Sequence, residues 1–417
     1  MNTKSLRRAQ ARNAKSKSFK NELNVLQLIH AKCNISRMEL AKQTGLSAAS
    51  ISAIVQNLID RGLVVESGHN SSVLGRKPIS LSLRDDAGFL VGVDLGSFYT
   101  RVVVTDIRGS LIYKQESKTG MPDGRDLVLS RTLKAIHKAI DDSGTPKSAF
   151  RGIGIGHSGV IDVSKGLVLS FPRPGQMAEW KNVPLRDILE REFGVPCLLE
   201  DSVRAIATAE KHFGLGKGLD DFIYVDVGMG IGAAIVLDGK LYRGPGGSAG
   251  EFGHMTVDEH GPLCCCGNYG CLETLASCGA IIQSVKSAIE KGVDSKVREL
   301  AQGDLNRSSI EIIGQAAMQN DSLSFRVLHE AVSHIGVALA DVVNLLNPHV
   351  LIFGGALFRS APELFLEPLK RTIKQRALEK SANEVQLKIS TLGSEAGALG
   401  AARLISEIVV ERLYQEY

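Results

Sequence analysis

The sequence predicts an N-terminal winged helix-turn-helix domain over residues 1–83, followed by an α/β body with two lobes over residues 84–417. Three observations predict this fold class. The net charge changes sign near residue 84, a helix–glycine turn–helix pattern precedes that point, and a strand–turn–strand hairpin occurs twice after it. A chain of 417 residues also exceeds what one hydrophobic core usually serves, so more than one domain is expected.

The two parts of the chain carry opposite net charge. Residues 1–83 contain 13 Lys and Arg against four Asp and Glu, a net charge of +9, whereas residues 84–417 contain 36 against 41, a net charge of −5. Seven of the basic residues form an N-terminal arm within residues 1–20, which contain no acidic residue. A basic head on a mildly acidic body indicates a nucleic-acid-binding domain. A solvated basic tail is the alternative.

Helical periodicity favours a folded domain. A helix is expected from Ser18, and Ser36 with Glu39 forms a capping box that begins a second, short helix ending at Gly45. Ser47 caps the third helix, whose apolar residues follow the spacing i, i+3, i+4, i+7, i+8: Ile51, Ile54, Val55, Leu58 and Ile59. Helix, glycine turn and second helix make the helix-turn-helix unit.

A β-hairpin wing follows, with apolar strands at 63–65 and 79–83 and two cations, Arg76 and Lys77, at its tip. We expect the domain to bind a double-stranded DNA operator, with these cations setting general affinity. The helix face opposite the apolar stripe is small and polar and is expected to contact bases: Ser47, Ala49, Ser50, Ser52 and Gln56. A protein-interaction module of the same fold is the alternative.

In the body, one hairpin pattern occurs twice. One copy has a strand with Asp94, an Asp-x-Gly turn and a second strand that leads to Asp106. The other copy has the same arrangement with Asp226 and Asp238, and in each copy the second Asp comes 12 residues after the first. Such a repeat predicts two similar subdomains facing each other over a cleft. An Asp-x-Gly turn exposes backbone N–H groups and a carboxylate, which suits phosphate and magnesium; a plain hairpin is the alternative.

Four of the seven cysteines lie between Cys264 and Cys271, which indicates metal chemistry in a reducing compartment and not disulfides. Together with one histidine they predict one closed, structural Cys₃His zinc site per chain: His254, Cys264, Cys266 and Cys271. Cys265 is expected to point away. A metal-free thiol cluster is the alternative. A catalytic zinc would need an open position, which four protein ligands do not leave.

Hydropathy argues against membrane insertion and secretion. The sequence contains no run of 18 apolar residues, and its N-terminus has no apolar signal segment. A cytoplasmic protein is expected.

The pattern Cys264-x-Cys266-Gly-x-x-Gly-Cys271-x-Glu273, preceded by Glu251-x-Gly-His254, resembles the signature of the ROK family (repressors, open reading frames, kinases). The resemblance covers about residues 88–405 and includes both Asp-x-Gly turns, the Gly354-Gly355 turn and a run of small residues near the C-terminus. The preceding winged helix is typical of ROK repressors and is absent from ROK sugar kinases.

This resemblance implies an actin-like, ribonuclease H-like body with two lobes. The first lobe would comprise residues 84–200, completed by a C-terminal helix at about 395–417, and the second would comprise residues 201–394 and carry the zinc-binding loop. The family also implies a sugar between the lobes and a homodimer or homotetramer.

The resemblance further implies that ATP chemistry is lost. The phosphate loops of ROK kinases read Asp-x-Gly-Gly-Thr and Gly-Thr-Gly, but this sequence has Phe98 and Met229 where the two hydroxyls should be. Alignment back from Ala209-Glu210 places Ser202 at the catalytic base, and a serine of ordinary acidity cannot replace a carboxylate base, a loss of about 10²–10⁴ in rate. We therefore expect no catalytic residue; a sugar kinase with a DNA-binding appendage is the alternative.

The sequence matches the sugar-binding positions of the family better than its phosphate loops and catalytic base. Glu251, His254 and Glu273 match them, while Asp201 and Ser202 depart from the Asn-Asp pair of the family. The sequence thus predicts a DNA-binding regulator, a repressor of carbohydrate-utilisation genes, whose operator binding is altered by a sugar or sugar phosphate in the cleft. An activator with the same DNA-binding heads is a further alternative.

Overall fold

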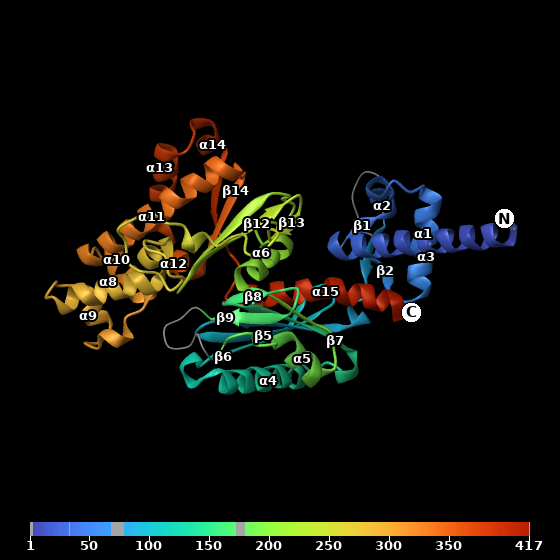
Figure 1. The fold of residues 1–417 in the computed structure, drawn as a ribbon, viewed down its shortest axis with the longest axis horizontal. Helices are drawn as coiled ribbons and strands as arrows, with labels where there is room; N and C mark the ends of the chain where they lie inside the picture. Colours follow the sequence, from blue (N-terminus) through green and yellow to red (C-terminus); the bar gives the residue numbers. More distant parts are fainter. Residues whose placement is uncertain (1–2, 33, 68–78, 172–179, 417) are drawn as a thin grey trace, which may run out of the picture.

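The structure is a computed structural model that describes residues 3–32, 34–67, 79–171 and 180–416. Figure 1 shows three parts along the long axis: a helical head with the N-terminus, a first lobe built on a sheet, and a second lobe with most of the helices. The C-terminal helix α15 (Ala396–Glu416) runs from the region between the lobes to the head. Among the described residues, no helix is long and apolar enough to cross a membrane.

The head has the winged helix-turn-helix arrangement. Its core contains the apolar stripe of the third helix, with Ile51, Val55 and Leu58 fully buried. Its three short strands pair in the order β1-β3-β2. In chain order, the elements are α1 (Thr3–Lys32), β1 (Ile35–Ser36), α2 (Arg37–Thr44), α3 (Ala48–Asp60), β2 (Val64–Ser67) and β3 (Ser80–Leu83).

The predicted helix ends of the head are confirmed. Ser36 Oγ accepts a hydrogen bond from the backbone N–H of Glu39, and the Glu39 carboxylate accepts one from the backbone N–H of Ser36 at 2.9 Å, which completes the capping box. Gly45 ends α2 with a φ of 71°, a conformation that glycine adopts without strain. Ser47 Oγ caps α3 by accepting from the backbone N–H of Ser50 at 3.1 Å.

The expected start of the first helix at Ser18 is wrong, because α1 begins at Thr3. Residues 3–17 contain neither Gly nor Pro and are rich in Lys, Arg and Ala, so helical propensity continues toward the N-terminus although no apolar stripe marks it. The basic arm therefore belongs to a 30-residue helix. The predicted wing tip, with Arg76 and Lys77, lies outside the described residues.

Within the described residues, the first lobe contains a five-stranded sheet in the order β10-β7-β4-β5-β6. The first Asp-x-Gly hairpin forms its antiparallel pair β4 and β5, and β7 and β10 add parallel strands on one side. The elements of this part are β4 (Phe89–Leu95), β5 (Tyr99–Asp106), β6 (Leu111–Lys118), α4 (Arg125–Asp142), β7 (Phe150–His157), β8 (Val160–Asp162), β9 (Leu167–Ser170), α5 (Leu185–Phe193), β10 (Cys197–Asp201) and α6 (Ser202–Phe213).

The described residues of the second lobe form a five-stranded sheet with the same topology, in the order β15-β14-β11-β12-β13. The second Asp-x-Gly hairpin forms β11 and β12, again flanked by parallel strands, so the sequence repeat corresponds to two similar sheets. The elements are β11 (Phe222–Val227), β12 (Ile231–Leu237), β13 (Lys240–Tyr242), α7 (Leu272–Ala276), α8 (Cys278–Glu290), α9 (Lys296–Leu300), α10 (Ile310–Met318), α11 (Ser322–Leu346), β14 (Val350–Gly354), α12 (Gly355–Ser360), α13 (Leu366–Arg376), α14 (Glu379–Glu384) and β15 (Gln386–Ile389).

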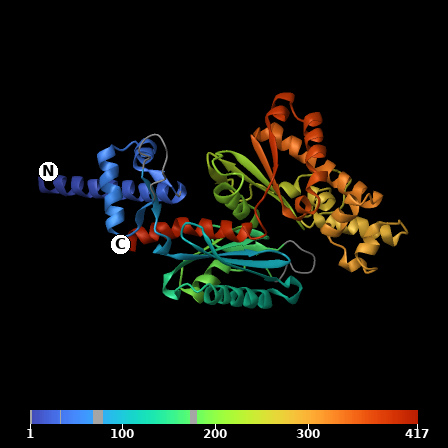
Figure 2. The ribbon, with the colours of Figure 1, turned by 180° about the vertical axis from the view of Figure 1, so that it is seen from behind.

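Helix α15 packs closely on the first sheet and also on the head. A Cβ atom added to Gly92 of β4 would lie 1.9 Å from the carbonyl oxygen of Ala398, so only glycine lets the helix approach this near. Farther along, Val409, Val410 and Leu413 of α15 belong to the same buried apolar cluster as the core of the winged helix. Figure 2 shows from behind that α15 lies between the first sheet and the head.

Candidate functional site

A cleft of about 340 Å³ lies where the two lobes meet. Both Asp-x-Gly turns line it, with Asp94 from the first sheet and Asp226 from the second. The Gly355 turn and the first turn of α15 close one side. Gly355 has a φ of 90°, and a Cβ atom there would lie 2.3 Å from the carbonyl oxygen of Val227, so the turn requires glycine. The sequence repeat thus forms two sides of one cleft.

The five residues predicted to bind sugar all line this cleft: Asp201, Ser202, Glu251, His254 and Glu273. Asp201 caps α6, because its Oδ1 accepts hydrogen bonds from the backbone N–H groups of Val203 and Arg204, both at 3.0 Å. Glu273 Oε2 accepts one from the backbone N–H of Ile231 at 2.9 Å. Each of these two carboxylates keeps a second oxygen for other partners. The structure brings the residues together, and their contact with sugar stays a prediction.

Burial changes the acidity of the carboxylates in the cleft. It raises the pKa of Asp201 to about 6, against the opposing effect of the nearby Arg204 guanidinium. It also raises the pKa of Asp94 to about 6, although Arg101 Nη1 lies 3.4 Å from Asp94 Oδ2. Both groups therefore change charge just below neutral pH.

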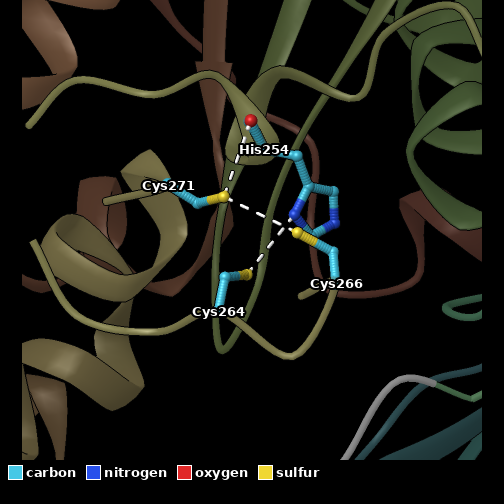
Figure 3. A group of neighbouring side chains, drawn as sticks. All are labelled: His254, Cys264, Cys266 and Cys271. Carbon is cyan, nitrogen blue, oxygen red and sulfur yellow. Dashed lines mark hydrogen bonds between the residues drawn. The ribbon is translucent and has the colours of Figure 1, made fainter. Parts of the chain in front are cut away.

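The predicted zinc ligands form one compact group (Figure 3), of which His254 also lines the cleft. The ligand atoms of His254, Cys264, Cys266 and Cys271 all lie within 4.8 Å of one another. His254 Nδ1 is 3.6 Å from Cys264 Sγ, and Cys266 Sγ is 3.7 Å from Cys271 Sγ. Three thiols and one imidazole that converge in this way could hold a metal ion.

Two glycines shape the loop that carries these cysteines. Gly270 has a φ of 63°, and a Cβ atom there would lie 1.5 Å from the carbonyl oxygen of Asp258. Gly267 also has a positive φ, 92°, in a turn where its backbone N–H donates to the Cys264 carbonyl oxygen at 2.9 Å. Cys265 is not one of the four, but its Sγ lies 4.0 Å from Cys264 Sγ, so the expectation that it points away is wrong. Only the two tight turns let residues so near in sequence point toward one ion.

His254 connects the metal-ligand group to the cleft. Its Nδ1 faces the thiols, whereas its Nε2 lies 4.0 Å from Glu251 Oε2 in the cleft wall. A metal on Nδ1 leaves Nε2 protonated, so toward the cleft this imidazole can only donate a hydrogen bond.

The predicted base-reading residues lie together on the head. All five are exposed on the face of α3 opposite its buried stripe: Ser47, Ala49, Ser50, Ser52 and Gln56. Ser47 and Ser50 are at the N-terminal end, and the Gln56 side chain donates to Asp60 Oδ1 at 2.8 Å. The N-terminal half of this face is small, which permits close approach to a DNA groove.

The residues predicted to replace the kinase hydroxyls, Phe98 and Met229, also line the cleft. They are 50% and 36% exposed, so both present apolar surface to the cleft. Ser202, which the resemblance aligns with the catalytic base, is the first residue of α6.

A buried carboxylate beside the cleft, Glu200, is not among the residues predicted from the sequence. Glu200 is 1% exposed and pairs with Arg204 and Arg243. In the sequence, only the Glu200-Asp201 pair at the end of an apolar strand points to this carboxylate. That pair does not indicate that Arg204 and Arg243 are its partners.

Comparisons with known proteins agree with this architecture. The ROK family model matches residues 90–408, and a model described as winged helix-turn-helix DNA-binding matches residues 19–65. A xylose repressor from Caldicellulosiruptor bescii is 33% identical over 391 residues, covering 93% of this chain and 96% of that protein.

Two solved structures show how far the likeness extends. The crystal structure of a ROK family transcriptional regulator, a homologue of the E. coli MLC protein, has a TM-score of 0.77 and 28% identity and covers 95% of this chain and 100% of its own. A ROK family glucokinase from Streptomyces griseus, in complex with glucose and AMPPNP, has a TM-score of 0.66 and 30% identity; it covers 76% of this chain and 99% of its own. The kinase fold thus corresponds to the two-lobed body, and the winged head lies in addition to it. On the extent of the family match and this additional head, the chain belongs to the ROK family and combines its actin-like body with an N-terminal winged helix-turn-helix.

Proposed function

We propose that this protein is a sugar-responsive transcriptional repressor of carbohydrate-utilisation genes. The winged helix binds a double-stranded DNA operator, and a sugar or sugar phosphate in the interlobe cleft alters that binding. One observation carries the proposal: α15 begins in the wall of the cleft and ends against the DNA-binding head.

The start and the middle of α15 make specific contacts. At its start, a Cβ atom on Gly397 would lie 2.9 Å from the Asp94 carboxyl carbon, so the helix lies directly on a cleft carboxylate. In its middle, Arg403 Nη1 donates to His30 Nε2 of α1 at 2.7 Å, and Ser406 Oγ lies 2.7 Å from the same nitrogen. These three side chains are at most 4% exposed. A shift of α15 at the cleft is therefore transmitted to the head through a packed, hydrogen-bonded contact.

The cleft suits a sugar. Asp201, Glu251 and Glu273 offer carboxylate oxygens that accept hydrogen bonds from hydroxyl groups, and His254 Nε2 offers a donor. The C. bescii relative is named a xylose repressor, which makes xylose the first ligand to test.

The metal-ligand group fits one structural zinc ion per chain. Its donors are three thiols and one imidazole, the closed set typical of structural zinc. When bound, zinc neutralises the thiolates and holds the loop. The chain's own residues then act on the sugar: His254 donates from Nε2, and Glu273, on the helix after Cys271, accepts.

We propose that the protein does not transfer phosphate. Phosphoryl transfer depends on hydrogen bonds that position the phosphates and on a base for the attacking hydroxyl. Phe98 and Met229 stand where two phosphate-binding hydroxyls are expected, and Ser202 stands where the carboxylate base is expected. A coupled ATP assay over a panel of monosaccharides tests this; turnover above the rate of a heat-denatured sample would revive the kinase alternative.

The mechanism we propose involves two subunits in a homodimer or homotetramer. Sugar closes the lobes, α15 moves with them, and the spacing of two DNA-reading heads no longer matches the two half-sites of the operator. Sugar shifts this equilibrium only through its different affinity for the two states, typically about 1–3 kcal/mol of coupling.

The direct test has two steps. A thermal-shift screen of monosaccharides and their phosphates identifies the ligand, because binding to the folded state raises the unfolding temperature. Fluorescence anisotropy with an operator selected from random DNA then measures affinity with and without that ligand. We expect at least about 5-fold weaker operator binding with sugar. Unchanged operator affinity at saturating sugar would contradict the proposal, and tighter binding would indicate an activator.

A further inference from the structure

Glu200 is a buried carboxylate in which both oxygens have partners. It is the penultimate residue of β10 and is 1% exposed. Its Oε1 accepts hydrogen bonds from Arg204 Nε and from the backbone N–H of Asp201, both at 2.9 Å. Its Oε2 accepts two more from Arg243, from Nη2 at 2.6 Å and from Nε at 2.9 Å.

The two arginines approach Glu200 from different parts of the fold. Arg204 lies in the first turn of α6, directly after β10, whereas Arg243 follows β13 of the second sheet. Strands β10 and β13 are each at the edge of their own five-stranded sheet. The cluster of Glu200, Arg204 and Arg243 therefore joins the edges of the two lobes.

Main-chain hydrogen bonds extend this cluster to the predicted sugar-binding residues. On the second lobe, Arg204 Nη1 donates to the carbonyl oxygen of Gly247 at 2.8 Å, and the carbonyl oxygen of Arg243 accepts from the backbone N–H of Ala249 at 3.0 Å. Glu251 follows two residues later. On the first lobe, Glu200 holds the backbone of Asp201. The cluster thus lies between Asp201 and Glu251 and contacts the backbone on both sides.

We propose that Glu200, Arg204 and Arg243 are positioning residues that fix the separation of Asp201 and Glu251 across the cleft and so determine which sugars bind. This inference rests on the proposed sugar-sensing function. A buried ion cluster adds little net stability, because the cost of desolvation offsets the attraction, but its geometry is well defined. Carboxylates held at a fixed separation discriminate between sugars that differ in the orientation of one hydroxyl, because a misplaced hydroxyl leaves a polar group unpaired.

The test replaces Arg243, because its side chain is 38% exposed and its loss leaves the Glu200–Arg204 pair intact. R243M keeps the length of the side chain and removes the ion pair between Arg243 and Glu200, while the hydrogen bond from Arg204 to Gly247 remains. R243K keeps the charge without the paired N–H groups. R131M is the matched control, since Arg131 pairs with Asp123 at an exposed site of the first lobe. The probes are xylose, glucose, N-acetylglucosamine and their C4 epimers, measured by calorimetry on the full-length protein.

We expect R243M to bind the preferred sugar at least about 10-fold more weakly and to lose most of the preference for that sugar over its epimer. R243K should recover part of both, and R131M should match the wild type. The zinc content and the operator affinity without sugar should stay near wild-type values in all three variants. R243M should unfold at a lower temperature, because Glu200 Oε2 loses both of its hydrogen bonds. A role in stability alone would lower the unfolding temperature and leave the preference between epimers unchanged.

Two results would overturn the inference: sugar affinities of R243M within twofold of wild type, or weaker binding with the epimer preference retained. Either leaves the proposed function intact, because the wild type still binds sugar. If the wild type binds no sugar in the panel or in the wider screen, the proposed function itself fails.

Discussion

The guanidinium of Arg61 lies over the ring of Tyr414, with Cζ 4.4 Å from the ring centroid, and Arg61 Nη2 donates to the Tyr414 carbonyl oxygen at 2.5 Å. Arg61 is the C-terminal cap of α3, the helix predicted to read DNA, and Tyr414 is in the last turn of α15. The Tyr414 hydroxyl also donates to Glu22 of α1 at 3.0 Å. The end of the helix that begins in the cleft thus contacts the end of the helix that is predicted to contact bases.

Replacing Tyr414 by Leu should separate DNA binding from the sugar response. The substitution removes the cation–π contact, worth about 0.5–1 kcal/mol, and the hydrogen bond to Glu22, while the buried core of the head remains. We expect operator affinity without sugar to stay within about threefold of wild type. The weakening of operator binding by sugar should largely disappear, because most of the coupling free energy of about 1–3 kcal/mol is lost. Anisotropy titrations with and without the identified sugar measure both quantities. Y414F keeps the ring and is the control; a full sugar response in Y414L would exclude this contact from the coupling.

The predicted zinc site can be tested by replacing one of its ligands, with a neighbouring cysteine of the same loop as the control. Replacing Cys266 by Ser removes one of the four predicted ligands. Loss of a residue that only supports a metal ligand weakens metal binding about 10–100-fold, so loss of a ligand should weaken zinc binding more. The loop that holds His254 and Glu273 then loses its anchor, so the sugar response should disappear while operator binding persists. Replacing Cys265, which lies outside the group of four, should change neither. Atomic emission spectrometry measures the zinc content. A normal sugar response in metal-free protein would contradict this role.

Much of the local structure can be predicted from the sequence because the signal and the structure lie within a few residues of each other. The Ser36–Glu39 capping box and the Gly45 turn are such cases. The cysteine cluster is another, since Gly267 and Gly270 bring Cys264, Cys266 and Cys271 together within one loop. The repeated Asp-x-Gly hairpin predicted two similar subdomains, which correspond to the two sheets of equal topology.

Contacts between distant residues were not predictable in this way. Glu200 and Arg243 are separated by 43 positions, and His30 and Arg403 by 373. Each pair depends on how whole elements pack, and a charged residue in the sequence does not identify its partner. The early start of α1 at Thr3 was missed for another reason, because residues 3–17 have helical propensity without an apolar face.

The DNA-binding predictions distinguish base contacts from phosphate contacts. Gln56 is exposed on α3, so Q56A should change the preference at one base pair by about 1–3 kcal/mol and leave the salt dependence unchanged.

Arg76 is predicted to contact phosphate, so R76A should weaken binding to all sequences alike and reduce the slope of log K against log salt by about one. Binding to a library of operator variants at several salt concentrations measures both. A change at one base in R76A would contradict the assignment of the wing.

Buried histidines should make the protein less stable in mild acid. Burial lowers the pKa of His157 to about 4, and burial together with Arg403 lowers the pKa of His212 to about 3. An unfolded histidine has a pKa of about 6.5. Their contribution to stability is therefore complete above about pH 6.5 and is lost as the pH falls below that value, by about 2 kcal/mol per histidine at pH 5.

The raised pKa values of Asp94 and Asp201 act in the opposite direction, because these carboxyls take up protons more readily in the folded state. A comparison between variants isolates the histidine contribution from theirs. Urea unfolding at pH 7 and pH 5 should show that H212Q loses about 2 kcal/mol less stability over this interval than the wild type. H137Q is the control, because His137 is half exposed beside Glu192, and it should keep the wild-type difference. An equal loss in H212Q and wild type would mean that His212 becomes protonated in the folded protein without cost, and would contradict the prediction.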